Sequence, residues 1–338
     1  MEVRPLPPER DRATSGDRPA PSVGRDRLTH VPTFHLRAPD QPFLESDVQL
    51  NPTAVTTASA FLGIPFGPPY EPQDLVVCAG AADAVRASAH KMEFRGLSDH
   101  YNFDWDGPFG DPDVTDCGDV VGDEADPDGI WDRGLDVSRA LVGQGVTPLV
   151  LGGLDAIPPI VVGAFEEPLH VLHVDSHLDF RQEIGGQTRG YSSPIRRIRE
   201  MPHVERIMQV GLRGMGSARP SDVDEAVAAG NELVTARDIH ERGIGTVVDR
   251  LGDDHRWVIT IDCDGLDPTI APAVGWPEPG GLTYPQISGI VRWLAERDRV
   301  AALVVTEFQP DLDIGGITAM HIVRLLVLVL GLQRRPLS

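Results

Sequence analysis

The chain has 338 residues, enough for one large α/β domain or two smaller ones. Hydrophobic residues make up 41% of it, so a substantial core can form. Its formal net charge of −21, from 30 basic and 51 acidic residues, argues against nucleic acids and anionic membrane surfaces as partners, because both attract basic proteins.

Cysteine usage and the apolar segments bear on the compartment. Cys78, Cys117 and Cys263 are scattered along the chain and show neither zinc-site nor redox-motif spacing. No signal-peptide pattern opens the chain, and the longest apolar run, residues 322–332, is too short to span a bilayer. We therefore expect a soluble, cytoplasmic protein with reduced cysteines.

The N-terminal segment differs in composition from the rest of the chain. Residues 1–40 are rich in Pro, Arg, Asp and Ser and lack hydrophobic periodicity, which predicts a flexible arm. Residues 41–338 are interpreted as one α/β domain. Early in this domain, Arg86 and the acidic residues at 114–119 are interpreted as structural.

Strand and helix patterns alternate along the domain. Apolar, β-branched runs predict strands, and apolar residues at helical spacing predict helices. The predicted strands are residues 59–66, 114–119 (at an edge of the sheet), 147–153, 169–174, 206–213, 232–236, 257–261 and 300–306. The predicted helices are residues 78–92, 131–145, 193–200, 221–230 with Ser221 as cap, 284–297 and 316–332. This alternation predicts an α/β fold of three layers, αβα, around a central, mostly parallel sheet.

Metal-type donors follow the predicted strand at 169–174. The sequence there continues Asp175-Ser176-His177-Leu178-Asp179, with donors at alternate positions. In extended chain, alternate residues share one face, and ligands of parallel sheets gather where the strands end. The other interpretation is a polar surface turn, because Asp and Ser favour turns.

A second strand ends in the same way. The run at 257–261 leads into Asp262 and Asp264. Two strand ends that supply carboxylates and an imidazole indicate a site for Mn, Fe, Co, Ni or Zn, and several carboxylates can bridge two ions. By contrast, His203, His240 and His255 stand alone in the sequence and are interpreted as ordinary surface or core residues.

These motifs together resemble those of a known family. Asp-x-His-x-Asp at 175–179, Asp-x-Asp-Gly-Leu-Asp-Pro at 262–268 and Gly-Gly-Leu-Thr at 280–283 are similar to the ureohydrolases, which include arginase, agmatinase and formiminoglutamase. The resemblance implies an arginase-like fold for residues 41–338 and an agmatinase-like amidinohydrolase. Such an enzyme would convert a guanidino substrate to urea and an amine by attack of metal-bound hydroxide. It also implies two Mn²⁺ per subunit and a homo-oligomer, a trimer or a hexamer.

The resemblance assigns roles to individual residues. Its metal ligands fall on Asp175, His177, Asp179, Asp262 and Asp264. Glu307, in Glu307-Phe-Gln-Pro, matches a family glutamate that lies beside the metals and pairs with the substrate guanidinium.

Two positions depart from the family pattern. Asp155 stands where the family has a metal-binding histidine; an aspartate can ligate the same ions through oxygen, or one metal is missing. Arg189 stands where the family has a histidine that protonates the leaving group. Arginine cannot exchange a proton near neutral pH, since its pKa exceeds about 12, but it could hold a carboxylate or carbonyl of the substrate.

Two alternatives to the agmatinase-like reaction follow from these departures. The enzyme could cleave a different C–N bond, such as that of a formimino group, and Arg189 would then favour an anionic substrate. Alternatively, the fold could be degenerate and bind a ligand or partner without catalysis. Metal content separates an enzyme from a non-catalytic protein, and urea against formamide separates the two reactions.

Overall fold

The structure, a computed structural model, describes residues 34–71, 74, 76–91, 99–122, 126–252 and 254–333. Most of the predicted arm, residues 1–40, lies outside this description. Near its end, Leu36 and Arg37 form the short strand β1 (Leu36–Arg37), which pairs with Val120 and Asp119. The arm stays a prediction for residues 1–33, whereas the folded part includes residues before position 41.

A nine-stranded sheet forms the middle of the described domain. In spatial order its strands are β1, β5 (Val114–Val120), β2 (Ser59–Ile64), β6 (Thr147–Gly152), β11 (Val300–Thr306), β10 (Trp257–Asp262), β7 (Leu169–Val174), β8 (Val204–Leu212) and β9 (Glu232–Thr235). Apart from β1, which is antiparallel to β5, every pairing in this sheet is parallel. The predicted mostly parallel sheet is confirmed.

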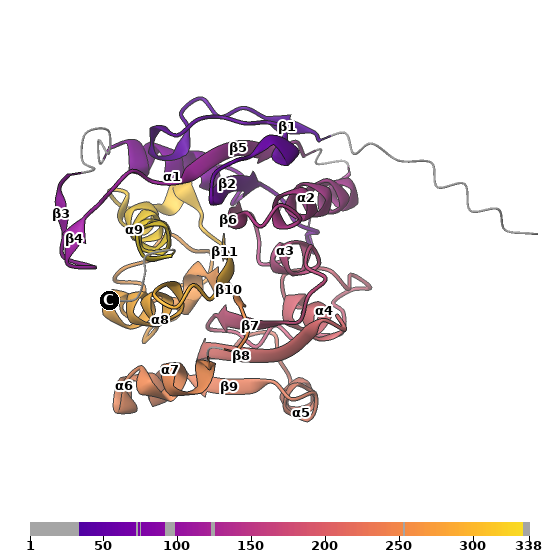
Figure 1. Ribbon diagram of the computed structural model, residues 1–338. Coiled ribbons are helices and arrows are strands. Elements are labelled where there is room, and N and C mark those ends of the chain that lie inside the picture. Colours follow the sequence, from indigo (N-terminus) through magenta and orange to yellow (C-terminus); the bar gives the residue numbers. More distant parts are fainter. Residues whose placement is uncertain are drawn as a thin grey trace, which may run out of the picture. The chain divides into compact units, whose positions relative to one another are not determined.

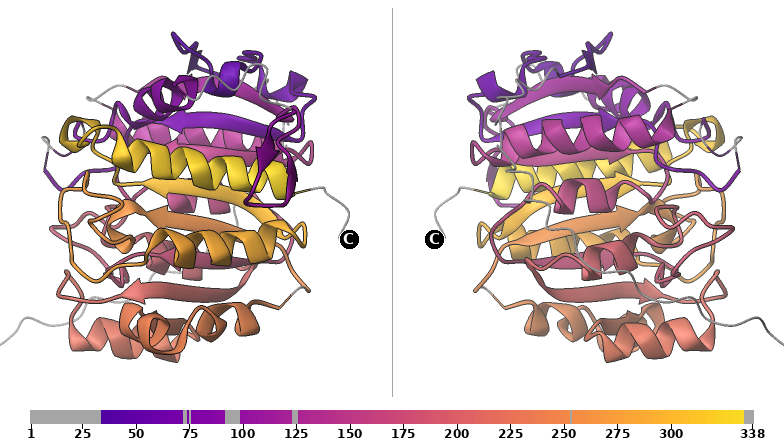
Figure 2. Two further views of the ribbon diagram at one scale, coloured as in Figure 1. Left: turned by 90° about the vertical axis from the view of Figure 1, so that its left-hand side faces the viewer. Right: turned by 90° about the vertical axis from the view of Figure 1, so that its right-hand side faces the viewer.

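Helices cover both faces of this sheet (Figures 1 and 2). One face carries α1 (Ala81–His90), α6 (Ala236–Arg242), α7 (Gly245–Leu251), α8 (Tyr284–Ala295) and α9 (Ile317–Leu332). The other carries α2 (Pro127–Val142), α3 (Pro158–Val162), α4 (Pro194–Arg199) and α5 (Pro220–Ala228). A hydrophobic cluster lies between the sheet and each helical layer, which confirms the three-layer αβα architecture. In the described part of the chain, no helix is both long and apolar enough to cross a membrane.

The central strands bring the ends of distant segments together. β7, β10 and β11 are buried along their whole length, because helices cover both faces of the sheet. Their register places Ile261 beside Val174 and Asp262 beside Thr306. The three strands therefore stop at the same level, which we call the carboxyl end of the sheet, and the residues that follow them emerge side by side.

Three details differ from the sequence-based expectations. The prediction that residues 114–119 form an edge strand is wrong, because β5 lies between β1 and β2. β1 is distant from β5 in sequence, and this pairing was not expected. The cap at Ser221 is also wrong: α5 begins at Pro220, and its N-cap is Arg219, since proline suits the first helical position. Finally, α3, α6 and α7 were not predicted, because helices of five to seven residues show too little periodicity.

The acidic residues of β5 have a structural partner, as expected. Arg86 of α1 is buried and donates to both carboxylate oxygens of Asp116, at 2.8 and 3.0 Å, and to Asp119 at 2.8 Å. Removing one member of such a buried group costs about 3–5 kcal/mol, because it leaves a charge unpaired. These carboxylates are thus neutralised within the protein, in contrast to those at the carboxyl end of the sheet.

Candidate metal centre

Four strands supply polar side chains where they end. β7 leads into Asp175, His177 and Asp179, and β10 ends at Asp262 and continues through the short turn η4 (Cys263–Gly265), which contains Asp264. Asp155 follows β6 by three residues, and Glu307 directly follows β11. The sheet order β6-β11-β10-β7 makes these strands immediate neighbours. The side chains therefore converge at one place, which agrees with the expectation from the two motifs.

One group of donors joins the two motifs. His177 Nδ1 lies 3.1 Å from Asp264 Oδ2 and 3.5 Å from Asp175 Oδ1. The three residues offer ligand atoms that all lie within 4.8 Å of one another, a spacing that could hold one metal ion. Ser176 supports this group, since its hydroxyl donates to Asp264 Oδ1 at 2.8 Å.

A neighbouring group contains a histidine that the sequence interpretation missed. Asp155, His173, Asp175 and Asp179 also offer ligand atoms within 4.8 Å of one another. His173 lies inside β7 and is fully buried, with Nε2 3.4 Å from Asp155 Oδ2 and 3.1 Å from Asp175 Oδ2. The alternation of residues 175, 177 and 179, extended one step back along the strand, would have found it.

Asp155 is held in place by contacts to two other strand ends. The Thr306 hydroxyl donates to Asp155 Oδ1 at 2.5 Å, and the Asp155 backbone N–H donates to Glu307 Oε1 at 2.8 Å. Its side chain is 1% exposed. Thus the aspartate that replaces the family histidine points into the cluster and belongs to it.

The two groups share Asp175, which suggests adjacent ion positions. Asp175 is fully buried, and among the described residues its Oδ2 accepts no hydrogen bond. Asp262 lies outside both groups but is also buried, and its Oδ1 accepts the backbone N–H of Asp264 at 2.8 Å. Buried carboxylates in this number are unfavourable without compensating charge. The donor set therefore fits divalent cations bound by oxygen and imidazole nitrogen.

The pKa values of the cluster reflect this crowding. Burial, and then the charge of Asp264, raise the pKa of Asp175 to about 6. Burial also raises the pKa of Glu307 to about 8, and the pKa values of Asp179 and Asp262 rise for the same reason. Without a cation, the folded chain thus resists full ionisation of these carboxyl groups.

The histidines respond in the opposite way to desolvation. Burial alone would lower the pKa of His177, but its hydrogen bond to Asp264 and the charge of Asp175 raise this pKa to about 9. His173 follows the same pattern with a pKa of about 10, because Asp175 and Asp155 outweigh its burial. The surrounding carboxylates thus favour the charged form of both histidines when no cation is present.

A cavity of about 520 Å³ opens onto the cluster. His177, Asp179, Asp262, Asp264 and Glu307 line its polar side. Tyr191, Met215, Val274 and Trp276 belong to the rest of the wall. This volume and this mixture of a few polar groups with nonpolar walls suit a small-molecule ligand.

Arg189 is not part of this arrangement. Its side chain is exposed, and its guanidinium carbon lies 4.9 Å from the centre of the Trp131 ring on α2. It does not line the cavity, whereas Tyr191 and Ser192 of the same segment do. The structure thus brings all seven other predicted metal and substrate residues to the cavity or to one of the two donor groups beside it, but it leaves Arg189 outside.

The backbone at two site residues is strained. Asp179 has a φ of 47° and Glu307 a φ of 60°. This left-handed region is unfavourable for residues with a β-carbon and is enriched at functional sites. Glu307 adopts this conformation directly after β11, and Asp179 adopts it in the loop that follows β7.

Comparison with known proteins gives a consistent result. The family model described as "Arginase family" matches residues 58–331. The mitochondrial arginase of Medicago truncatula is 34% identical over 219 residues, which is 61% of this chain and 63% of that protein. The agmatinase of Pyrococcus horikoshii is 31% identical over 190 residues, 56% of this chain and 63% of that protein.

A solved structure extends the comparison over more of the chain. Proclavaminate amidino hydrolase from Streptomyces clavuligerus superimposes with a TM-score of 0.74 at 23% identity, covering 88% of this chain and 98% of that one. At this identity the likeness concerns the fold alone. The sequence matches span a little under two thirds of the length of the two curated relatives.

Proposed function

Because this chain belongs to the arginase family, we propose that it is a metal-dependent amidinohydrolase that converts a guanidino compound to urea and an amine, in the manner of an agmatinase. The observation that supports this most directly is the pair of buried donor groups that share Asp175 beside a cavity. Divalent ions bound there, Mn²⁺ by the family resemblance, would activate water and polarise the substrate.

The two groups would each hold one ion. Asp175, His177 and Asp264 would bind one of them, and Asp155, Asp175 and Asp179 the other, with Asp262 as a further ligand. His173 would return an imidazole to the second position, where the family histidine has been replaced by Asp155. Its Nε2 lies at ligand-to-ligand distance from both Asp155 and Asp175. This compensation favours an active enzyme over a degenerate fold.

Glu307 would bind the cationic end of the substrate. One of its oxygens already accepts the Asp155 N–H, which fixes the carboxylate at the cavity wall. A guanidinium group in the cavity could then donate a charge-assisted hydrogen bond to the other oxygen. Arg189 contributes to neither step, because its guanidinium is outside the cavity and stacked on Trp131.

The direct test is product formation by the full chain after loading with Mn²⁺. Agmatine, arginine, guanidinobutyrate and guanidinopropionate would be assayed for urea, and formiminoglutamate for formamide. We expect urea from at least one guanidino compound, and loss of this activity in Asp264→Asn. Formamide alone would assign a different C–N bond, and neither product from protein with bound metal would support the non-catalytic alternative.

Three finer expectations stay predictions. They are the identity of the metal as Mn²⁺, the assembly into a trimer or hexamer, and the cytoplasmic location. Metal analysis after mild purification addresses the first, and light scattering of the purified chain addresses the second.

A further inference from the structure

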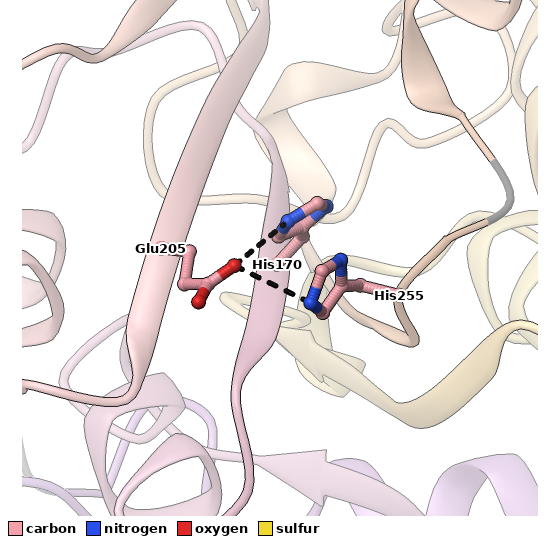
Figure 3. A group of neighbouring side chains, drawn as sticks. All are labelled: His170, Glu205 and His255. Atoms are coloured by element: carbon pink, nitrogen blue, oxygen red, sulfur yellow. Dashed lines mark ion pairs between the residues drawn. The ribbon is translucent and has the colours of Figure 1, made fainter.

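A second group of metal-type donors lies at the opposite end of the same strands (Figure 3). His170 is the second residue of β7, Glu205 is the second residue of β8, and His255 lies two residues before β10. These three strands are adjacent in the sheet, in the order β10-β7-β8. His170 and Asp175 are five residues apart on β7, which corresponds to about 16 Å of extended chain. The group is therefore separate from the carboxyl-end cluster, and we refer to its location as the amino end of the sheet.

The distances in this group suit a small divalent ion. Glu205 Oε2 lies 3.3 Å from His255 Nε2 and 3.9 Å from His170 Nε2, and the three ligand atoms lie within 4.8 Å of one another. Zinc binds nitrogen and carboxylate oxygen at about 2.0–2.2 Å, so two ligands of a tetrahedral ion are about 3.4 Å apart. One separation already has this value, and Glu205 is half exposed, so its side chain is free to close the other.

The backbone directs Glu205 toward the histidines. The pairing of β7 and β8 passes from Leu169 with Val204 to His170 with Arg206, so Glu205 is an extra, unpaired residue on its strand. Such a bulge turns a side chain away from the direction that regular alternation would give it. Without the bulge, the register would not place this carboxylate beside the two rings.

The histidines have the surroundings of metal ligands. The second ring nitrogen of His255, Nδ1, lies 3.2 Å from Asp254 Oδ2 but makes no hydrogen bond among the described residues. His170 is 5% exposed, and its Nδ1 is buried without a hydrogen-bond partner among the described residues. The two rings lie close, with centroids 4.5 Å apart, and Trp257 closes the inner side of His170 with its ring centroid at 4.8 Å.

A simple ion pair explains this group less well than a metal does. His170 is almost fully buried, and burial, followed by the nearby His255, lowers its pKa. At 3.9 Å, His170 Nε2 is too far from Glu205 Oε2 for a hydrogen bond.

We propose that His170, Glu205 and His255 form a second cation site that binds Zn²⁺, with the partly exposed side left for a water molecule. Two imidazoles and one carboxylate are a ligand set that zinc commonly uses. The ion would tie β7, β8 and the segment before β10 together at the amino end of the sheet. This site is independent of the proposed amidinohydrolase activity.

The test compares zinc binding by the Mn²⁺-loaded full chain and two single variants. Each protein is titrated with ZnCl₂, passed through gel filtration and analysed for bound zinc. We expect the unaltered chain to retain about one more Zn²⁺ per chain than His255→Gln or Glu205→Gln, each of which should bind zinc more than about 10-fold more weakly at this position. Glu205→Gln changes a half-exposed residue, so a folded protein remains available for the test.

Two further measurements decide the outcome. His90→Gln is the matched control, because His90 lies 3.9 Å from Glu45 but belongs to none of the three-donor groups in the described chain; it should bind as much zinc as the unaltered protein. Zinc should also raise the unfolding temperature of the unaltered chain more than that of the two variants. Equal zinc content and equal thermal shifts in all four proteins would overturn the proposal. Urea formation serves as a separate readout, which neither variant should change.

Discussion

The two ends of β7 carry different donors in different surroundings. At the carboxyl end, five buried aspartates and two histidines from three strands crowd around a cavity. At the amino end, two histidines and one half-exposed glutamate lie against Trp257. An oxygen-rich, enclosed cluster requires several positive charges and leaves room for a substrate, whereas a nitrogen-rich group needs only one ion. Under the two proposals, one strand positions a catalytic site at one end and a metal ion that ties neighbouring strands together at the other.

Asp175→Asn separates the two ends most strongly. Asp175 belongs to both donor groups of the carboxyl end, so its loss should empty that end of Mn²⁺ and reduce urea formation by about 1,000-fold or more. Zinc retained at the amino end should stay unchanged. Metal analysis and urea assays check both statements. Asp254→Asn, at the other end of the sheet, is the matched control and should leave Mn²⁺ content and urea formation as they are.

Glu307→Gln distinguishes substrate binding from metal binding within the carboxyl end. A hydrogen bond to a charged group contributes about 1.5–3 kcal/mol, so the neutral amide should lower kcat/KM for a guanidino substrate by about 10–100-fold. Mn²⁺ content should be retained, because Glu307 belongs to neither donor group. Loss of the metal together with the activity would show that Glu307 acts as a ligand.

Removal of the metal should make the free energy of unfolding of the protein depend on pH. Burial first, and then neighbouring charge, raise the pKa of Asp175 to about 6 and that of Glu307 to about 8 in the metal-free fold. Because these values exceed those of an unfolded chain, this stability is fully present below about pH 4 and is lost as the pH rises, by about pH 6 for Asp175 and by about pH 8 for Glu307. Chelator-treated protein should therefore unfold several degrees lower at about pH 8.5 than at about pH 6. Added Mn²⁺ should remove the difference, and Glu307→Gln should reduce it.

Arg189→Ala should have the smallest effect. The guanidinium stacks on Trp131 in an exposed position, and such contacts contribute about 0.5–1 kcal/mol. We expect a slight loss of thermal stability and a change in kcat/KM below about 3-fold. A much larger loss of urea formation, with unchanged folding, would show that Arg189 takes part in the reaction, as the family resemblance suggests.

The sequence was a good guide wherever local pattern and parallel pairing determine position. Asp175, His177, Asp262 and Asp264 follow two buried strands, and parallel strands in register must bring such residues together. The αβα layers follow from the alternation of strands and helices for the same reason. Glu307 could be assigned only through the resemblance, because a single glutamate after a strand carries no distinctive pattern.

Other features depend on contacts that no local pattern determines. The approach of His173 to Asp155 joins β7 to the loop after β6, and the position of Arg189 depends on the path of the loop before α4. His255 was interpreted as an isolated residue, because its neighbours His170 and Glu205 are at least 50 residues away in sequence and meet it only through the sheet order and one bulge.

The left-handed backbone at Asp179 and Glu307 has a consequence for how this fold can change. Each of these conformations costs on the order of 1–2 kcal/mol for a residue with a β-carbon, and each carboxylate also repels its neighbours when no ion is present. Directed evolution for heat resistance alone should therefore enrich Asp179→Gly and Glu307→Gly, which relieve both penalties. The most heat-resistant variants would then be those that have lost the two carboxylates on which the proposed activity depends.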